Sequence, residues 1–159
     1  MSCGLVIATA LLLSNPDVAL AASVDPATVP ADLSGLAGEP LFNDIAGRSG
    51  RLKGVAEGWT LSGAHRASDF LQGGEWLAFR TEAMALSELD MQGHLILTQR
   101  ESQGDMACIL RGVAEDIPAR LAAMEAAETD QDRDMALAEL VHLFDDNGAV
   151  ITSPAQTFP

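Results

Sequence analysis

Aromatic side chains are scarce in this chain of 159 residues. There are two Trp and five Phe but no Tyr, and together the aromatic residues make up 4% of the sequence. Modules that bind sugars or single-stranded nucleic acids rely on exposed aromatic rings on which the ligand stacks. The composition therefore disfavours both classes. With 48% hydrophobic residues the chain can still bury a core, which must be built largely from Leu, Ala, Val, Ile and Met.

Positive charge is also scarce. Nine Lys and Arg residues face 23 Asp and Glu residues, which gives a formal net charge of −14, and the nine cations are scattered along the sequence. A globule this acidic repels phosphate backbones and anionic lipid headgroups at long range. We therefore expect no nucleic-acid partner, and a cationic protein or small molecule is the partner that the charge would attract. The simpler interpretation is that the charge maintains solubility.

The first twenty-one residues are typical of an export signal. An apolar run of ~9 residues from Leu5 to Leu13 is followed by a polar break and then by small residues, which predicts cleavage between Ala21 and Ala22. The run is shorter than the ~20 residues that span a bilayer, so we expect no stable membrane span once the signal is removed. No Lys or Arg precedes the run, unlike most such signals, and a buried N-terminal core segment is the alternative. The expected location is periplasmic or secreted.

Cysteine is the third scarce residue, with only Cys3 and Cys108 in the chain. Cleavage would remove Cys3, so Cys108 would stand alone and no intramolecular disulfide could form. Cys108 lies in an apolar segment, which predicts a buried and inert thiol. Because only Asp17 among the 23 acidic residues lies in the signal, the mature chain would keep 22 of them and a formal charge of −13.

Length and composition predict one globular domain. We assign residues 1–21 to the signal peptide, 22–40 to an extended leader that contains Pro26, Pro30 and Pro40, 41–153 to the domain, and 154–159 to a tail.

The central part of the domain favours strands. Glycine recurs at positions 47, 50, 54, 58 and 63, and each Gly inside a helix costs ~1 kcal/mol relative to Ala, so 51–61 is interpreted as a strand or turn. From 87 to 99, Leu89, Met91, Leu95 and Leu97 occupy alternate positions, the period of a half-buried strand pair that could turn at Gln92-Gly93. Residues 106–113 fit either a helix or a buried strand.

The C-terminal part favours helices over about 117–128 and 131–146. Pro118 suits the first turn of the first helix, and Asn147-Gly148 would end the second before a short edge strand over 149–152. The predicted fold class is therefore α+β, with a small antiparallel sheet whose strands lie within about 51–113 and two C-terminal antiparallel helices. The alternative is an all-α helical bundle.

Each of the three histidines has a carboxylate nearby in sequence. The pairs are His65 with Asp69, Asp90 with His94, and Glu139 with His142. Separations of three and four place both side chains on one face of a helix, where they could share a metal. Carboxylate-bridged di-iron bundles need the Glu-x-x-His pair twice, and one copy is present. Structural or solvated histidines are the simpler interpretation.

No other motif indicates a reaction. The sequence has no Gly-x-Ser-x-Gly, no phosphate-binding loop and no Cys-x-x-Cys. Asp130, Asp132 and Asp134 alternate as in a calcium loop but lack its Gly and its final Glu, and they suit a helix first turn instead. The acidic pairs Glu115/Asp116 and Asp145/Asp146 could approach as a glycosidase pair, although solvated surface charge is simpler. We therefore assign no catalytic, cofactor-binding or metal-binding residue and expect no cofactor.

Two functional hypotheses follow. The first is a small, acidic, exported binding or accessory protein of the bacterial envelope, non-catalytic and of unknown ligand. The second is a periplasmic helical bundle that binds a metal or cofactor, with Glu139 and His142 among its ligands. A hydrolase that uses His65 or scattered carboxylates has no sequence feature in its favour.

Overall fold

The computed structural model describes residues 35–100 and 104–152, and these residues are almost wholly helical. A short helix, α1 (Gly35–Gly38), precedes four long ones. The long helices are α2 (Pro40–Ser62), α3 (Gly74–Leu97), α4 (Gly104–Ala126) and α5 (Asp130–Thr152), and two 3₁₀ turns, η1 (Ala64–Arg66) and η2 (Phe70–Gln72), lie between α2 and α3.

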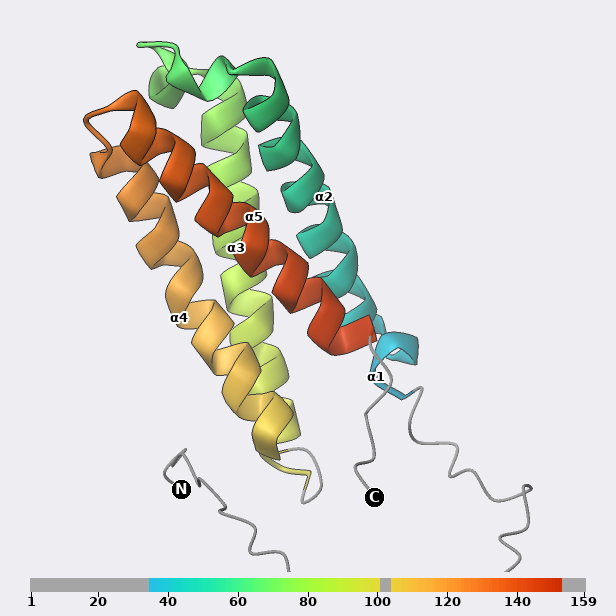
Figure 1. The fold of residues 1–159 in the computed structure, drawn as a ribbon. Coiled ribbons are helices and arrows are strands. Elements are labelled where there is room, and N and C mark those ends of the chain that lie inside the picture. The colour runs from blue at the N-terminus through green and yellow to red at the C-terminus, as the bar shows by residue number, and fades with distance from the viewer. Residues whose placement is uncertain (1–34, 101–103, 153–159) are drawn as a thin grey trace, which may run out of the picture. The chain divides into compact units, whose positions relative to one another are not determined.

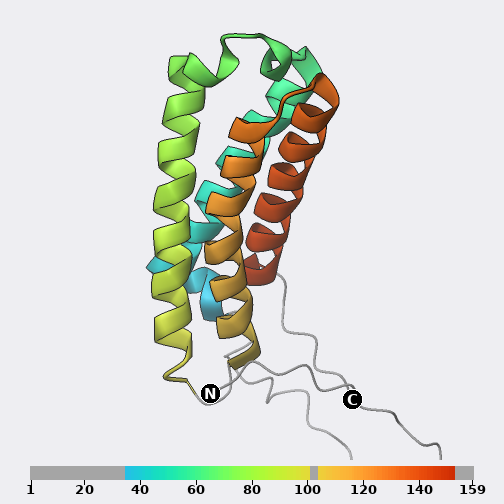
Figure 2. The same ribbon diagram turned by 90° about the vertical axis from the view of Figure 1, so that its left-hand side faces the viewer.

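The four long helices form an antiparallel up-down-up-down bundle (Figures 1 and 2). Each long helix packs against its two neighbours in the ring α2–α3–α4–α5. The connection with η1 and η2 lies at the same end of the bundle as the turn between α4 and α5 (Figure 1). Within the described residues, none of the helices combines the length and the apolarity that crossing a membrane requires.

The predicted α+β fold is wrong, and the alternative, an all-α bundle, is confirmed. No strand occurs among residues 35–100 and 104–152, so the sheet expected within 51–113 and the edge strand expected over 149–152 are both helix. The two C-terminal helices exist but are longer than predicted. Helix α4 begins at Gly104, so Pro118 lies inside it, and α5 continues through Asn147-Gly148 to Thr152.

Buried residues recur at alternating spacings of three and four along the helices. This is the heptad pattern of helices that pack side by side with small crossing angles. In α2 the buried residues are Phe42, Ile45, Ser49, Leu52, Ala56 and Trp59. In α3 they are Trp76, Phe79, Ala83, Leu86, Asp90, Gly93 and Leu97. In α5 they include Leu137, Leu140, Phe144, Asn147 and Ile151.

The strand prediction over 87–99 failed because two of the three core positions of α3 there are not apolar. Asp90 and Gly93 are buried, whereas Leu95 is 56% exposed. Gly93 fits tightly there, since a Cβ atom at this position would lie 2.8 Å from Leu110 Cδ1 and 3.1 Å from Phe42 Cε1, and these side chains would have to shift. Because Asp90 and Gly93 occupy core positions, the apolar residues of this segment do not follow the helical period.

The glycine-rich segment forms helix α2 because the face of the helix opposite the exposed glycines is buried in the core. Phe42, Ile45 and Leu52 are buried, and each such burial contributes about 1.5–3 kcal/mol. That exceeds the cost of ~1 kcal/mol for each interior glycine. Gly50 and Gly54 lie on the exposed face, where an added Cβ would meet no atom within 4 Å.

Helix α4 continues through Pro118 with help from α3. Proline has no N–H, so the carbonyl of Ala114, four residues earlier, loses its helical hydrogen bond. The hydroxyl of Ser87 on α3 donates to that carbonyl at 2.7 Å. The α3–α4 interface thus contains one hydrogen bond that replaces the one removed by the proline.

The few aromatic residues are concentrated at one end of the bundle. Five of the seven lie in one cluster with neighbouring ring centroids 4.8–6.2 Å apart. They are Trp59, Phe70, Trp76, Phe79 and Phe144. Edge-to-face and offset contacts of this kind stabilise beyond simple area burial, so this cluster holds the α2–α3 connection onto the bundle.

Candidate functional site

A buried polar layer crosses the bundle between α2, α3 and α5. Ser49 from α2, Asp90 from α3 and Asn147 from α5 each occupy a core position and are fully buried. Asn147 Nδ2 donates to Ser49 Oγ at 3.1 Å and to the two carboxylate oxygens of Asp90 at 3.0 and 3.2 Å. Ser49 Oγ donates in turn to the carbonyl of Ile45 at 2.9 Å.

Burial raises the pKa of Asp90 to about 7, and the hydrogen bond from Asn147 offsets only part of that effect. Among the described residues, the Oδ1 atom of Asn147 is buried with no hydrogen-bond partner. A protonated Asp90 could donate to an amide oxygen, so the layer suits a neutral acid as well as a carboxylate. Because its members are sealed in the core, the layer is not accessible to a substrate.

A second polar cluster fastens the end of the bundle. His65 is buried, and its Nδ1 and Nε2 atoms lie 3.0 Å from the Trp59 carbonyl oxygen and 2.6 Å from Asp134 Oδ1. The carbonyl oxygen accepts hydrogen bonds, and so does the carboxylate of an ionised Asp134. Arg66 Nε and Nη2 donate to the same carboxylate at 2.9 and 2.7 Å.

This arrangement stabilises the ionised form of Asp134. The hydrogen bond from Arg66, followed by that from His65, lowers the pKa of Asp134 to about 2. Arg133 also donates to the carbonyls of Arg66 and Ala67 at 3.4 and 3.2 Å. The cluster therefore ties the α2–α3 connection to the first turns of α5, which is a structural role.

The structure separates the predicted histidine–carboxylate pairs. Asp69 is exposed, and His65 contacts Asp134 instead. Asp90 faces the polar layer, whereas His94 Nδ1 donates to the carbonyl of Ala107 on α4 at 2.8 Å. Neither pair shares a site.

Glu139 and His142 on α5, the ligands considered under the alternative hypothesis, are not brought together with further donors. Glu139 forms an ion pair with Arg120 at 2.6 Å, and His142 is exposed to solvent. No group of three or more His, Cys, Asp and Glu side chains within residues 35–100 and 104–152 is arranged to hold a metal ion.

Two of the three aspartates predicted for the first turn of α5, Asp130 and Asp132, lie there, whereas Asp134 binds His65 and Arg66 instead. Asp132 N donates to Thr129 Oγ1 at 3.1 Å, and Thr129 Oγ1 donates to Asp132 Oδ2 at 2.7 Å. This reciprocal contact caps the helix. Asp130 is exposed in the same turn, where a negative charge favours the helix dipole.

The remaining candidates are also accounted for. Glu115 and Asp116 are both exposed on α4, as predicted for solvated charge.

Cys108 is half-buried on α4 and is not a free thiol, because it is disulfide-bonded. The prediction of a lone, inert thiol is therefore wrong for this structure. The cleavage site at Ala21 and Ala22 lies outside the described residues and stays a prediction.

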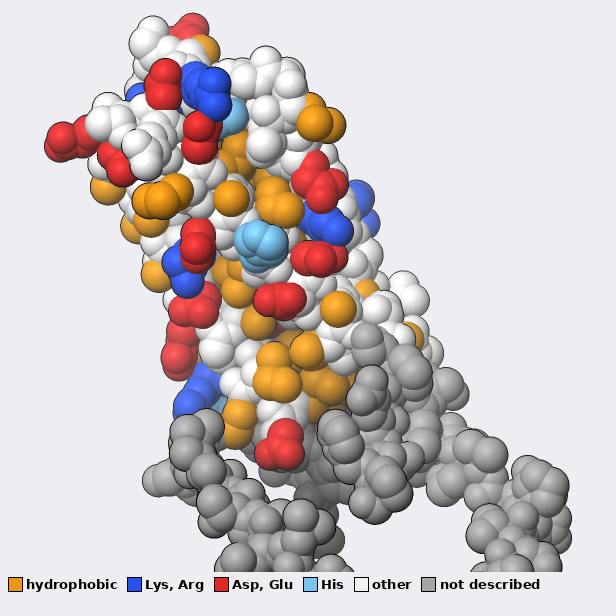
Figure 3. Space-filling view, viewed as in Figure 1, with side chains coloured by type: hydrophobic (Ala, Val, Ile, Leu, Met, Phe, Trp, Pro, Cys, Tyr) orange, Lys and Arg blue, Asp and Glu red, His pale blue; other side chains and the backbone are white. Residues whose placement is uncertain are grey.

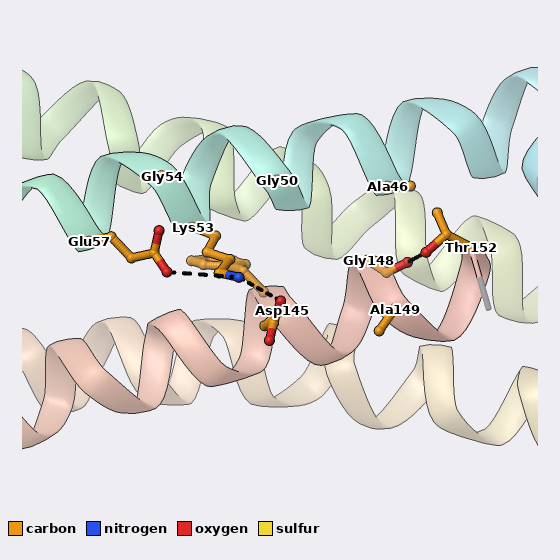
Figure 4. Close-up of a pocket in the computed structure, with 10 residues that line it drawn as sticks. Ala46, Gly50, Lys53, Gly54, Glu57, Asp145, Gly148, Ala149 and Thr152 are labelled. Carbon is orange, nitrogen blue, oxygen red and sulfur yellow. Dashed lines mark hydrogen bonds and ion pairs between the residues drawn. The ribbon is translucent and has the colours of Figure 1, made fainter.

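An accessible groove runs along the seam of α2 and α5 (Figure 4). It consists of two hollows, of about 510 and 380 Å³, which share Glu57 in their walls. The larger hollow is lined by Ala46, Gly50, Lys53, Gly54, Glu57, Phe144, Asp145, Gly148, Ala149 and Thr152. The smaller one is lined by Glu57, Thr60, Leu61, Ala138, Val141 and His142. We call the two together the α2–α5 groove.

Lys53 lies in the larger hollow between two carboxylates. Its Nζ atom is 2.7 Å from Asp145 Oδ1 and 3.8 Å from Glu57 Oε1 (Figure 4). The hydrogen bond to Asp145 raises the pKa of Lys53, so the ammonium stays charged at neutral pH. Gly50 and Gly54 line the same hollow without side chains, which leaves its α2 wall open.

The smaller hollow is more apolar. Leu61 is 89% exposed at its edge, and Ala138 and Val141 face it from α5. On the same side of the molecule, hydrophobic side chains alternate with acidic ones over the surface (Figure 3). The α2–α5 groove thus offers an apolar end with charged side chains beside it.

Comparison with protein families, with curated proteins and with solved structures finds no match to this chain. The function must therefore be argued from the geometry. Sequence reasoning missed the groove because Lys53 and Asp145 are 92 residues apart. The one available signal was the shared helical face of Gly50 and Gly54, and the strand interpretation set it aside.

Proposed function

We propose that the protein is an exported, non-catalytic binding module of the cell envelope and that its binding surface is the α2–α5 groove. The observation that carries the proposal is the make-up of the groove. Gly50 and Gly54 each cost the helix ~1 kcal/mol, yet neither is needed for packing, since a Cβ there would meet no atom within 4 Å. Leu61, exposed to 89%, stands at the end of the same groove. Glycines that open a groove beside an exposed apolar side chain suit a surface that is covered by a partner.

The non-catalytic part of the proposal is supported by the contacts of His65, Asp90 and Asp134. His65 contacts Asp134 and the Trp59 carbonyl, and Asp134 also accepts from Arg66. Asp90 is sealed in the polar layer. These contacts occupy the groups that a general acid or base would need to leave free. Export is supported by the leader sequence alone.

Export is tested by mass spectrometry of the protein from its native host after cell fractionation. We expect a chain that begins at Ala22 and is found outside the cytoplasm. The same mass shows whether Cys3 still accompanies Cys108. An intact N-terminus in the cytosol contradicts this part of the proposal.

The binding surface is tested by photo-crosslinking in the same host. A photoreactive amino acid placed at Gly54 should give a discrete crosslinked product, because this position lines the groove. The matched control is Gly112 on α4, where an added side chain also meets no atom within 4 Å and which lines neither hollow. Equal products at both positions, or none at Gly54, contradict the groove as the binding surface.

A helical bundle that binds a metal or cofactor is the second candidate, and the all-α fold favours it. The donors Glu139 and His142 would need additional ligands from outside the described residues. Elemental analysis of protein purified from the native host tests it. A stoichiometric metal that is lost on His142→Ala supports this candidate, and its absence from the native protein contradicts it.

A further inference from the structure

We infer that the partner held by the α2–α5 groove is a basic amphipathic helix of about four turns. The inference rests on the proposed function and names the class of ligand that the groove would take. It draws on the length of the groove, on the distribution of apolar and charged groups along it, and on the charge of the whole chain.

The length of the groove favours a rod-like occupant. Its α2 wall runs from Ala46 to Leu61, which at ~1.5 Å per residue is about 22 Å. A helix of about fifteen residues has that length. The wall is low because Gly50 and Gly54 have no side chains, and small residues allow the axes of two packed helices to approach to ~8 Å.

The chemistry of the groove favours a helix with one apolar side and positive charges beside it. Leu61 and Val141 provide an apolar anchor at one end. Beside it, where the two hollows meet, Glu57 and Asp145, with side chains 49% and 57% exposed, already hold the ammonium of Lys53 between them. The same carboxylates can accept hydrogen bonds from Lys or Arg side chains of a partner.

The charge of the whole protein disfavours two other occupants of the groove, a second copy of the chain and an anionic membrane surface. With a formal charge of −14, a second copy of the chain and an anionic membrane surface are both repelled at long range. A cationic helix is attracted, and its association is steered. Laying an amphipathic helix into an apolar groove is an established mode of peptide recognition.

The test uses three fluorescein-labelled peptides of sixteen residues and the whole protein. The first is an amphipathic helix of Leu and Lys, the second has every Lys replaced by Gln, and the third is a scramble of the first that keeps its composition. Fluorescence anisotropy is measured at physiological ionic strength. We expect the first peptide to bind at least about ten-fold more tightly than the other two, because only it matches both the apolar stripe and the charge.

Two variants locate the binding. Gly54→Leu fills the groove, and it should leave the fold intact because an added Cβ meets no atom within 4 Å. Leu61→Glu removes the apolar anchor at a position that is 89% exposed. Each should weaken binding of the basic peptide by at least about ten-fold, as the loss of a central contact does. The matched controls, Gly112→Leu on α4 and Leu77→Glu on α3, should retain it.

The outcomes separate the inference from the proposed function. If the basic peptide binds Gly54→Leu as well as the original protein, it binds elsewhere on the acidic surface and the inference is overturned. If the Gln peptide binds as tightly as the basic one and Gly54→Leu abolishes both, the groove stands as a binding surface and only the cationic class of partner falls. If Gly54→Leu affects no peptide and Gly54 yields no crosslink in the native host, both fail.

Discussion

Two aspartates in this bundle sit in opposite environments. Asp90 lies at a core position with its hydrogen bonds coming from one neutral amide, and its pKa is raised to about 7. Asp134 lies near the surface, where Arg66 and His65 both donate to it, and its pKa is lowered to about 2. The same side chain is therefore driven toward its neutral form in one place and toward its charged form in the other.

The difference shows what determines the charge of a carboxylate in a small bundle. A buried neutral donor such as Asn147 satisfies the hydrogen bonds of a carboxylate but leaves the desolvation of its charge uncompensated. At a partly exposed position, a charged donor such as Arg66 satisfies the hydrogen bonds of the carboxylate and also compensates the desolvation of its charge. Asp90 therefore makes the fold more stable in mild acid, and Asp134 makes it more stable away from strong acid.

The largest effect is expected from Asp90→Asn. Because the folded pKa of Asp90 lies above its ordinary value of 3.8, its stabilising contribution is complete below pH 3.8 and is lost as the pH rises through about 7. That window corresponds to about 4 kcal/mol of unfolding free energy at most. Urea unfolding between pH 4 and 8 should show a fall in stability for the original protein that is largely absent in the variant. Asp116→Asn, at an exposed position on α4, is the control, and an unchanged slope in Asp90→Asn would contradict the assignment.

Asn147→Ala should have the next largest effect. It removes the donor that faces both oxygens of Asp90 and leaves the buried carboxyl group without that partner. We expect a loss of about 1–3 kcal/mol of unfolding free energy at pH 7 and a further rise in the pKa of Asp90. The carboxyl carbon shift of Asp90, followed by NMR titration, measures that pKa. A pKa that falls toward 3.8 would mean that Asn147 does not stabilise the ionised form.

At the end of the bundle, His65→Leu should destabilise more moderately. The variant loses the contacts of His65 with the Trp59 carbonyl and with Asp134, although these acceptors keep Gly63 N–H and Arg66 as donors, and the loss of such hydrogen bonds costs about 1–2 kcal/mol. The loss is measured by thermal or urea unfolding at pH 7. Hydrogen exchange should accelerate over 63–73, since this connection is what the contact holds. Exchange that accelerates in α4 instead would contradict the fastening role.

Asp134→Asn should produce the smallest change, and in the opposite pH range from Asp90→Asn. The stability that Asp134 contributes is present above pH 3.8 and is lost as the pH falls toward about 2. The group is partly exposed, so solvent reduces the effect. Unfolding between pH 2 and 4 should be less pH-dependent in the variant, and the curves of the two proteins should run parallel above pH 5. A difference that grows above pH 5 would contradict this account.

The sequence predicted best where apolar residues and core positions coincide. In α5, Leu137, Leu140 and Phe144 are both the apolar stripe and the buried set, so the helix was found. In α2 the exposed residues include Val55 and Leu61, while Ser49 and Ala56 are buried. A residue-by-residue pattern cannot reveal a core position that is filled by a small or polar side chain.

The contacts that build the sites were out of reach for a different reason. His65 was paired with Asp69 because they are four residues apart, whereas its partner Asp134 is 69 residues away. Likewise, the seam that brings Lys53 to Asp145 exists only once α5 has folded back along α2. Both contacts depend on the order of helices around the bundle, which sequence periodicity does not specify.

Because Ser87 on α3 donates a hydrogen bond to the Ala114 carbonyl, the continuity of α4 depends on its contact with α3. A peptide of residues 104–126 on its own has no donor for that carbonyl except water, and its two halves on either side of Pro118 should bend independently. With α3 alongside, α4 is one continuous helix from Gly104 to Ala126. The smallest fragment able to reproduce α4 is therefore the α3–α4 hairpin, and any dissection or circular permutation of this protein should keep those two helices together.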